Sequence, residues 1–316
     1  MDIALTPARE TVGARALADL YSVYLDDLRP TVAAQTMRNY ASQIRPACAF
    51  WQEYGPAHDW QIAPETGAAL LAYLRRTGRA QNSIRTIVRR VRQYLKWLHT
   101  SGRLPIDISA WVDLPAAAQT PVKVLTTDEL QRLFGACQGM TRVRDMTLLA
   151  FLVETGARRA EAAALDYKNI QWAASVMAGS AYLEVVKGYR DTDKRRTVRF
   201  GPKTGKLLQI MRVVYGRDLL AGNVFELTNS GVSYAMGALS NRSGVDFAPH
   251  DLRRTFATFW MKHCRAPSPA LAEQLLQVQL GHSAQNVTQA HYVRLTHDDV
   301  AQHYVSPLDG VDLYGL

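Results

Sequence analysis

Apolar residues recur at helical spacing along most of this 316-residue chain, and the period shortens to that of a β-strand in one region only. That region contains two runs, 182–187 and 195–200, which a polar stretch separates, so we expect a β-hairpin with a long polar tip. Helices are expected over residues 12–28, 33–54, 82–100, 140–154, 201–216, 230–243, 251–264, 268–278, 285–294 and 297–304, with another that begins near Pro64. The pattern therefore predicts a mostly α fold with one small β-hairpin, in the α+β class.

A stretch of weak periodicity divides the chain into two parts. Residues 105–124 contain three prolines and no helical or strand pattern, which is typical of a linker. The spacing of Thr126 and Glu129 matches a capping box, so a new helix is expected to begin there. We therefore expect a helical domain over residues 1–104 and a second domain over residues 125–316.

Composition narrows the class of protein. The formal net charge is +9, which favours a polyanionic partner such as nucleic acid. No apolar run approaches the ~18 residues of a membrane span, so no membrane partner is expected, and the first residues lack the features of a signal peptide. The three cysteines, Cys48, Cys137 and Cys264, are scattered and odd in number, which indicates a reducing compartment. A cytoplasmic protein is expected.

Four side chains between residues 250 and 292 carry chemistry that suits a phosphodiester. His250 and Arg253 are three residues apart, so they share one face of a helix. His282 follows Leu280-Gly281, and Tyr292 lies ten residues further on. An arginine fork binds phosphate oxygens, histidine exchanges a proton near neutral pH, and tyrosine can act as a covalent nucleophile. The set predicts a phosphoryl-transfer site.

An upstream arginine completes a recognisable set. Thr155-Gly156-Ala157-Arg158 is followed by Glu161. Together with the His-x-x-Arg pair at 250 and 253, the Leu-Gly-His triplet and Tyr292, this order resembles the tyrosine recombinases, the family of phage integrases and Xer-type resolving enzymes. In that family the tyrosine commonly follows the histidine of the triplet by nine residues. Here the gap is ten, so the intervening loop must absorb one extra residue.

The resemblance implies a role for each residue of the set. Arg158 and Arg253 would neutralise the non-bridging oxygens of the scissile phosphate, and His282 would add a hydrogen bond to one of them. Tyr292 would attack phosphorus and form a 3′-phosphotyrosyl enzyme. His250 is the candidate that receives the tyrosine proton, since a phenol is mostly protonated at neutral pH.

A lysine in the hairpin is implied as the acid for the leaving 5′-oxygen. Lys187 matches that position best, and Lys194 competes with it because the hairpin tip is long. The covalent intermediate conserves the bond energy, so no ATP, metal or other cofactor is expected. Cys264 and the histidines around it fit no standard zinc spacing.

One basic helix face is the candidate for phosphate contact in the helical domain. From residue 75 to residue 106 the chain has nine Lys or Arg and no acidic residue, whereas a merely solvated face usually mixes the two signs. Within this stretch one helical face carries the candidate DNA-binding residues Arg85, Arg89, Arg92 and Lys96. The helices before the second domain also resemble the core-binding domain of the family.

The resemblance implies double-stranded DNA with specific half-sites as the partner, a homotetramer on DNA and association with the nucleoid. Two other functions stay open: a type IB topoisomerase, which relaxes DNA without strand exchange, and a DNA-binding regulator with a degenerate site. The tail, 297–316, could dock on a neighbouring subunit or on its own domain. Because the first helix is expected near residue 12, no additional arm-binding domain is expected before it.

Overall fold

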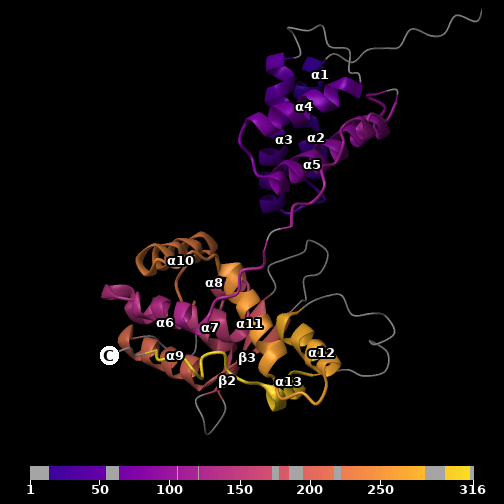
Figure 1. Ribbon diagram of the computed structural model, residues 1–316. Helices are drawn as coiled ribbons and strands as arrows, with labels where there is room; N and C mark the ends of the chain where they lie inside the picture. Colours follow the sequence, from indigo (N-terminus) through magenta and orange to yellow (C-terminus); the bar gives the residue numbers. More distant parts are fainter. Residues whose placement is uncertain are drawn as a thin grey trace, which may run out of the picture. The chain divides into compact units, whose positions relative to one another are not determined.

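The computed structural model describes residues 14–54, 64–104, 106–119, 121–172, 178–184, 195–216, 222–281 and 296–313. The described residues form two compact units, which we call the helical unit (up to residue 119) and the C-terminal unit (from residue 121) (Figure 1). Each unit has its own hydrophobic core. Helices dominate both units, and the described strands form one small antiparallel sheet. The predicted fold class, mostly α with a small β element, is confirmed.

The helical unit contains α1 Ala14–Asp19, α2 Tyr21–Leu28, α3 Ala34–Tyr54, α4 Pro64–Arg76, α5 Gln81–Thr100 and the short 3₁₀ helix η2 Ser109–Trp111. The single helix expected over residues 12–28 is therefore wrong in one respect, since α1 and α2 are separate at Leu20. The apolar stripe of α5 is buried as its period predicts, from Ile84 to Leu98. Tyr94 on this helix donates a hydrogen bond of 2.6 Å to the carbonyl of Leu17, which connects α5 to α1.

Much of the stretch expected to be a linker packs on the helical unit. Ile108 and Val112 are buried in its core. Further along, the amide side chain of Asn82 on α5 bonds both backbone groups of Ala118, accepting from its N–H at 2.9 Å and donating to its carbonyl at 3.0 Å. The chain up to residue 118 is therefore attached to α5.

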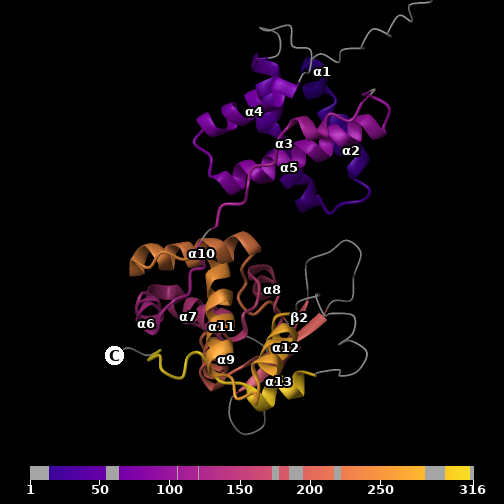
Figure 2. The same cartoon turned by 45° about the vertical axis from the view of Figure 1, so that its right-hand side comes forward.

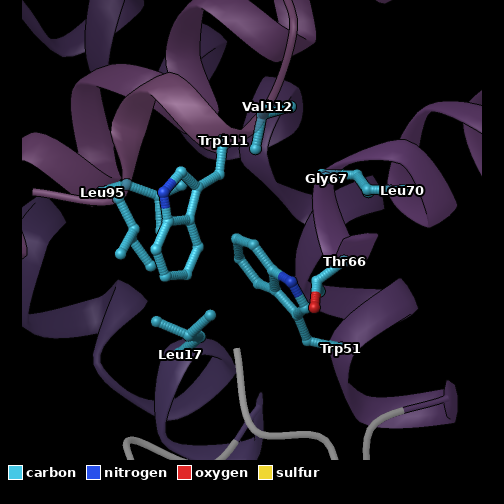
Figure 3. Close-up of a pocket in the computed structure, with 9 residues that line it drawn as sticks. Leu17, Trp51, Thr66, Gly67, Leu70, Leu95, Trp111 and Val112 are labelled. Atoms are coloured by element: carbon cyan, nitrogen blue, oxygen red, sulfur yellow. The ribbon is translucent and has the colours of Figure 1, made fainter. Parts of the chain in front are cut away.

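A small open hollow lies between α1, α3, α4, α5 and η2, and the rings of Trp51 and Trp111 point into it (Figure 3). Gly67 lies in its wall, where α4 meets η2. A Cβ atom at Gly67 would lie 2.0 Å from the carbonyl oxygen of Trp111, so only glycine allows this backbone approach.

We expect Gly67→Ala to lower the free energy of unfolding of the helical unit by about 1–3 kcal/mol, because the added methyl group forces α4 and η2 apart. Urea denaturation followed by tryptophan fluorescence measures the change, since Trp51 and Trp111 report on this hollow. Gly135→Ala is the matched control, because a Cβ there meets no atom within 4 Å. Equal unfolding midpoints for Gly67→Ala and wild type would contradict the close approach.

The C-terminal unit contains α6 Thr127–Gly135, η3 Gly139–Thr141, α7 Arg142–Thr155, α8 Arg159–Ala163, η4 Tyr167–Asn169, β1 Ile170–Trp172, β2 Gly179–Glu184, β3 Arg195–Phe200, α9 Pro202–Val214, α10 Asn229–Ser243, α11 Pro249–His263, α12 Pro269–Leu280 and α13 His297–His303. The predicted capping box begins α6: Thr126 accepts from the N–H of Glu129, whose carboxylate accepts from the N–H of Thr126. Helix α7 is buried along its length, from Asp145 to Thr155, and forms the centre of this unit.

The sheet has the order β1-β2-β3, with both pairs antiparallel. The expected hairpin pairing is confirmed, with Ala181 opposite Val198. Strand β1 and helix α8 were not predicted, because segments of three and five residues are too short for a period to show. The polar tip, 188–194, the end of the first expected strand, 185–187, and the helix expected over 285–294 lie outside the described residues.

The tail packs on its own C-terminal unit. Leu308, Val311 and Leu313 are buried in the core of this unit. The Nζ atom of Lys203 on α9 donates to the carbonyls of Leu308 and Val311 at 2.7 and 2.6 Å. Of the two dockings that the sequence leaves open, the structure shows the one within the chain.

Candidate active site

Arg158 follows a sharp turn at the end of α7. Gly156 caps this helix in the left-handed conformation, with φ of 61°. A Cβ atom there would lie 2.7 Å from a methyl carbon of Leu280 and 2.8 Å from the ring of Phe256. Both the backbone conformation and the close packing therefore require glycine. The turn places Arg158 at the start of α8, beside the end of α12.

A buried carboxylate holds Arg158. Glu161, only 1% exposed, accepts from the backbone N–H of Arg158 at 2.6 Å and from its Nη1 at 2.8 Å. The same carboxylate accepts from Nη2 of Arg196 on β3 at 2.6 Å. Burial alone would raise the pKa of Glu161, but the bonds and charges of Arg196 and Arg158 outweigh it and lower the pKa. Glu161 is therefore ionised and fixes two guanidinium groups.

Arg253 connects the ends of two helices. It lies on α11 and is 4% exposed. Its Nη1 donates to the carbonyl of Gly156 at 2.6 Å and its Nη2 to the carbonyl of Leu280 at 2.7 Å. Burial lowers the pKa of Arg253, and the charges of Arg196 and Arg158 lower it further, to about 9. The guanidinium is still a cation at neutral pH, and it satisfies carbonyls at the C-termini of α7 and α12.

His250 lies in the first turn of α11, one turn before Arg253. Partial burial lowers the pKa of His250, and the neighbouring guanidinium groups of Arg254, Arg253 and Arg158 lower it further. The imidazole is therefore neutral at neutral pH. The structure thus brings Arg158, His250 and Arg253 close together. Their surroundings are the helices of the C-terminal unit in which α11 lies between α7 and α12 (Figures 1 and 2).

Four of the predicted site residues, Lys187, Lys194, His282 and Tyr292, lie outside the described residues. The described chain reaches this site at Leu280 and Gly281, the first two residues of the Leu-Gly-His triplet. Gly281 caps α12 with φ of 62°, and a Cβ atom there would lie 2.5 Å from Cδ of Arg196.

Two site residues were missed in the sequence. Arg196 is buried, and Gln279 on α12 is fully buried. The amide group of Gln279 donates to the carbonyl of Arg199 and accepts from its N–H, both at 3.1 Å, so it extends the pairing of β3 onto α12. For Arg196 a signal was present: it alternates with Val198 and Phe200, so the period of the strand places it on the buried face. For Gln279 no pattern distinguishes it from an exposed glutamine.

His297 is a second imidazole near this site, at the start of α13. Among the described residues, neither of its ring nitrogens has a hydrogen-bond partner, and both are buried. Burial lowers the pKa of His297 to about 4, with Arg199 and Arg196 of β3 adding repulsion and Asp298 of α13 opposing it. The folded unit therefore holds His297 neutral.

This neutral imidazole predicts that acid destabilises the C-terminal unit. The folded pKa of His297, about 4, lies below the ordinary value of 6.5, so below pH 6.5 the unfolded chain binds a proton that the folded unit does not. The free energy of unfolding is therefore highest above pH 6.5 and decreases as the pH falls towards 4. We expect the wild type to lose about 3 kcal/mol more than His297→Phe over this range. Urea denaturation at pH 7.5, 5.5 and 4.5 measures this. Parallel curves of stability against pH for the two proteins would contradict it.

The four candidate DNA-binding residues of the helical unit differ in their exposure and in their contacts. Arg85 is half-buried and donates to the carbonyl of Pro115, so it holds the segment that follows η2. Arg89 and Lys96 are exposed and Arg92 is half-buried. Within the described part of the chain, no ion pair or side-chain hydrogen bond involves these three residues.

The described residues contain no group of three or more His, Cys, Asp or Glu side chains arranged to hold a metal ion. They also contain no helix that is both long enough and apolar enough to span a bilayer.

Comparison with known families covers both units. Residues 123–298 match the profile described as the Phage integrase family. Residues 22–102 match the profile described as the N-terminal SAM-like domain of phage integrases.

Named relatives agree with these profiles. The tyrosine recombinase XerA of Saccharolobus solfataricus is 27% identical, over 72% of this chain and 68% of that protein. The tyrosine recombinase XerC of Mycobacterium bovis is also 27% identical, over 91% of this chain and 96% of that protein.

Solved structures show the same fold. A lambda integrase (75–356) dimer bound to a COC′ core site superposes with a TM-score of 0.65 at 19% identity, and covers 90% of this chain and all of that chain. A lambda integrase tetramer bound to a Holliday junction gives a TM-score of 0.64 at 20% identity, over 89% of this chain and 77% of that chain. The chain belongs to the phage integrase family of tyrosine recombinases, enzymes that break and rejoin DNA strands.

Proposed function

We propose that this protein is a site-specific recombinase that cuts and rejoins DNA through a covalent bond between Tyr292 and a 3′-phosphate. The observation that carries the proposal is the gathering of three guanidinium groups, those of Arg158, Arg196 and Arg253, around one carboxylate, that of Glu161. Three positive groups against one negative group leave a net charge of two positive units. Attack by a phenolate on a phosphodiester passes through a state with two negative charges, which this site would stabilise.

Strand cleavage exchanges one ester bond at phosphorus for another. The Oη atom of Tyr292 forms a bond to phosphorus while the bond from phosphorus to the 5′-oxygen breaks. The tyrosine proton passes to His250, whose lowered pKa keeps a nitrogen lone pair available at neutral pH. Lys187, or Lys194 in its place, supplies the proton to the leaving 5′-oxygen. Religation reverses the step on another strand, and the conserved bond energy removes any need for ATP or a metal ion.

The proposed roles of the two parts follow the division of the chain. The helical domain, residues 1–104, is proposed to grip DNA and residues 125–316 to carry out catalysis. Specific half-sites are proposed as the substrate, with two duplexes held by a tetramer. The lambda integrase dimer bound to a COC′ core site and the lambda integrase tetramer bound to a Holliday junction support this assembly.

The test is a nicked duplex whose short 5′-hydroxyl fragment diffuses away after cleavage, so that any covalent adduct is trapped. The duplexes are drawn from DNA that flanks the gene, where the half-sites of a recombinase are expected. We expect an adduct that survives denaturing electrophoresis and forms equally in EDTA without ATP. The absence of an adduct on every flanking duplex would favour the regulator with a degenerate site. Relaxation of supercoiled plasmids of any sequence would favour a type IB topoisomerase.

The basic face of α5 gives a prediction for binding. We expect Arg89→Ala with Lys96→Ala to weaken DNA binding at low salt, because two exposed cations no longer displace counterions from phosphates. The slope of log affinity against log salt should fall by about two units. Arg90→Ala is the control, since Arg90 stacks on the ring of Tyr40 instead, with 3.2 Å from the guanidinium carbon to the ring centre. An unchanged slope in the double variant would move the phosphate contacts to another face.

A further inference from the structure

Arg196 is a charged residue on an otherwise apolar face. It lies on β3, where alternate residues point into the core, and it is 8% exposed. Val198 and Phe200, which follow it on the same face, are fully buried. A buried ion pair is seldom more stabilising than apolar side chains of the same volume, so stability alone gives a poor reason for a guanidinium at this position.

One edge of the Arg196 guanidinium reaches Arg158 through a carboxylate. Its Nη2 and Nε atoms donate to the two carboxylate oxygens of Glu161, at 2.6 and 3.3 Å. Those same two oxygens bind the backbone and the guanidinium of Arg158. The geometry of this fork therefore determines how the Glu161 carboxylate is turned, and with it the direction of the Arg158 side chain.

Another N–H group of Arg196 reaches the end of α12. Its Nη1 donates to the carbonyl of Gln279. Its aliphatic stem packs on Gly281, so closely that a Cβ atom there would lie 2.5 Å from Cδ of Arg196. Arg196 therefore contacts both the carboxylate that holds Arg158 and the turn that precedes His282.

We propose that Arg196 is a positioning residue for strand cleavage, which aligns Arg158 through Glu161 and holds the end of α12 through Gln279 and Gly281. The inference rests on the proposed function, since it assigns Arg158 to the scissile phosphate. Because β3 is one arm of the hairpin that carries the candidate lysines, Arg196 also connects that strand to the arginine site.

The test uses the full-length chain and single-turnover cleavage of a nicked duplex that the wild type cleaves. We expect Arg196→Met to lower the cleavage rate about 10²-fold, with DNA affinity within about twofold of wild type and a cooperative thermal transition. Arg199→Met is the matched control on the opposite, half-buried face of the same strand, with cleavage expected near the wild-type rate. Wild-type cleavage by Arg196→Met would overturn the inference.

A second substrate separates positioning from general loss of structure. A methylphosphonate at the scissile position removes the negative charge that Arg158 is proposed to neutralise. On this neutral linkage we expect the difference between wild type and Arg196→Met to shrink to a few-fold. An equal loss on both linkages would show that Arg196 does not act through Arg158.

A conservative variant covers the case in which Arg196→Met does not fold. Arg196→Lys keeps the cation but cannot bond both Glu161 oxygens and the Gln279 carbonyl at once. About a tenfold loss of cleavage is expected, again smaller on the methylphosphonate. Cleavage by Arg196→Lys at the wild-type rate would overturn the inference. Absence of an adduct with the wild type on either linkage would instead count against the proposed function.

Discussion

A chain with phenylalanine in place of Tyr292 is expected to bind DNA with wild-type affinity and to form no covalent adduct. The change removes one oxygen, the atom proposed to attack phosphorus, and leaves the charges of Arg158 and Arg253 unaltered. Phosphate contacts, which dominate affinity, are therefore retained, whereas the bond that defines the reaction cannot form. Electrophoretic mobility shift and denaturing electrophoresis of the same samples measure the two properties together.

The matched control removes a hydroxyl from a tyrosine outside the proposed site. Tyr215 caps α9 and donates to the carbonyl of Met140 at 3.0 Å. Tyr215→Phe is expected to form the adduct at the wild-type rate. An adduct with Tyr292→Phe, or its loss with Tyr215→Phe at full stability, would show that the nucleophile has been assigned to the wrong tyrosine.

Arg253→Ala is expected to lower the rate of cleavage by about 10²–10³-fold, because a preorganised donor at a developing negative charge is removed. It should also lower the free energy of unfolding by about 1–3 kcal/mol, since the carbonyls of Gly156 and Leu280 lose the donors that the guanidinium supplies. Single-turnover cleavage and urea denaturation measure the two effects. A loss of stability without a loss of rate in the folded protein would limit Arg253 to a structural role.

Two further variants test whether the geometry of Arg253 or only its charge is required. Arg253→Lys retains a cation but loses the fork that reaches both carbonyls, so an intermediate rate is expected. Lys262→Ala removes an exposed charge from the same helix and should leave cleavage unchanged. If Lys262→Ala lowered the rate as strongly as Arg253→Ala, the effect would arise from the net charge of the helix, and the position of Arg253 would not matter.

Long periodic elements were predictable because one face of each is buried over several turns. The apolar stripe of α5 is an example, and it is present. The start of α6 was predictable from a local signal, the capping box before it, which is also present. The sheet was predictable only in part. The pairing of β2 with β3 follows from two alternating runs, but β1, Ile170–Trp172, is too short to carry a period and forms only because β2 offers it an edge.

The motif residues were predictable for a different reason. Gly156 and Gly281 each occupy a left-handed cap where a side chain would collide with a neighbour, and each is followed closely by a predicted site residue. The sequence order thus indicated that Arg158, His250 and Arg253 belong together, and the structure brings them to the ends of α7 and α12 and the start of α11. Their roles in the reaction stay predictions.

The carboxylate network could not be predicted in full. Glu161 stood at a familiar spacing, but its second partner, Arg196, lies 35 residues further along on another element. A run of basic residues, Arg195-Arg196, suggests an exposed hairpin arm, and only the alternation with Val198 and Phe200 indicates burial. Contacts of this kind depend on how β3 packs against α8 and α12, which local pattern does not determine.

The residue that carries the DNA can be identified directly. The trapped adduct is digested with protease and nuclease, and the remaining peptide–nucleotide conjugate is sequenced by mass spectrometry. We expect a nucleotide joined through its 3′-phosphate to the hydroxyl of Tyr292, in a peptide that also contains His291. A nucleotide attached to any other residue, or an adduct linked to a 5′-phosphate, would contradict it.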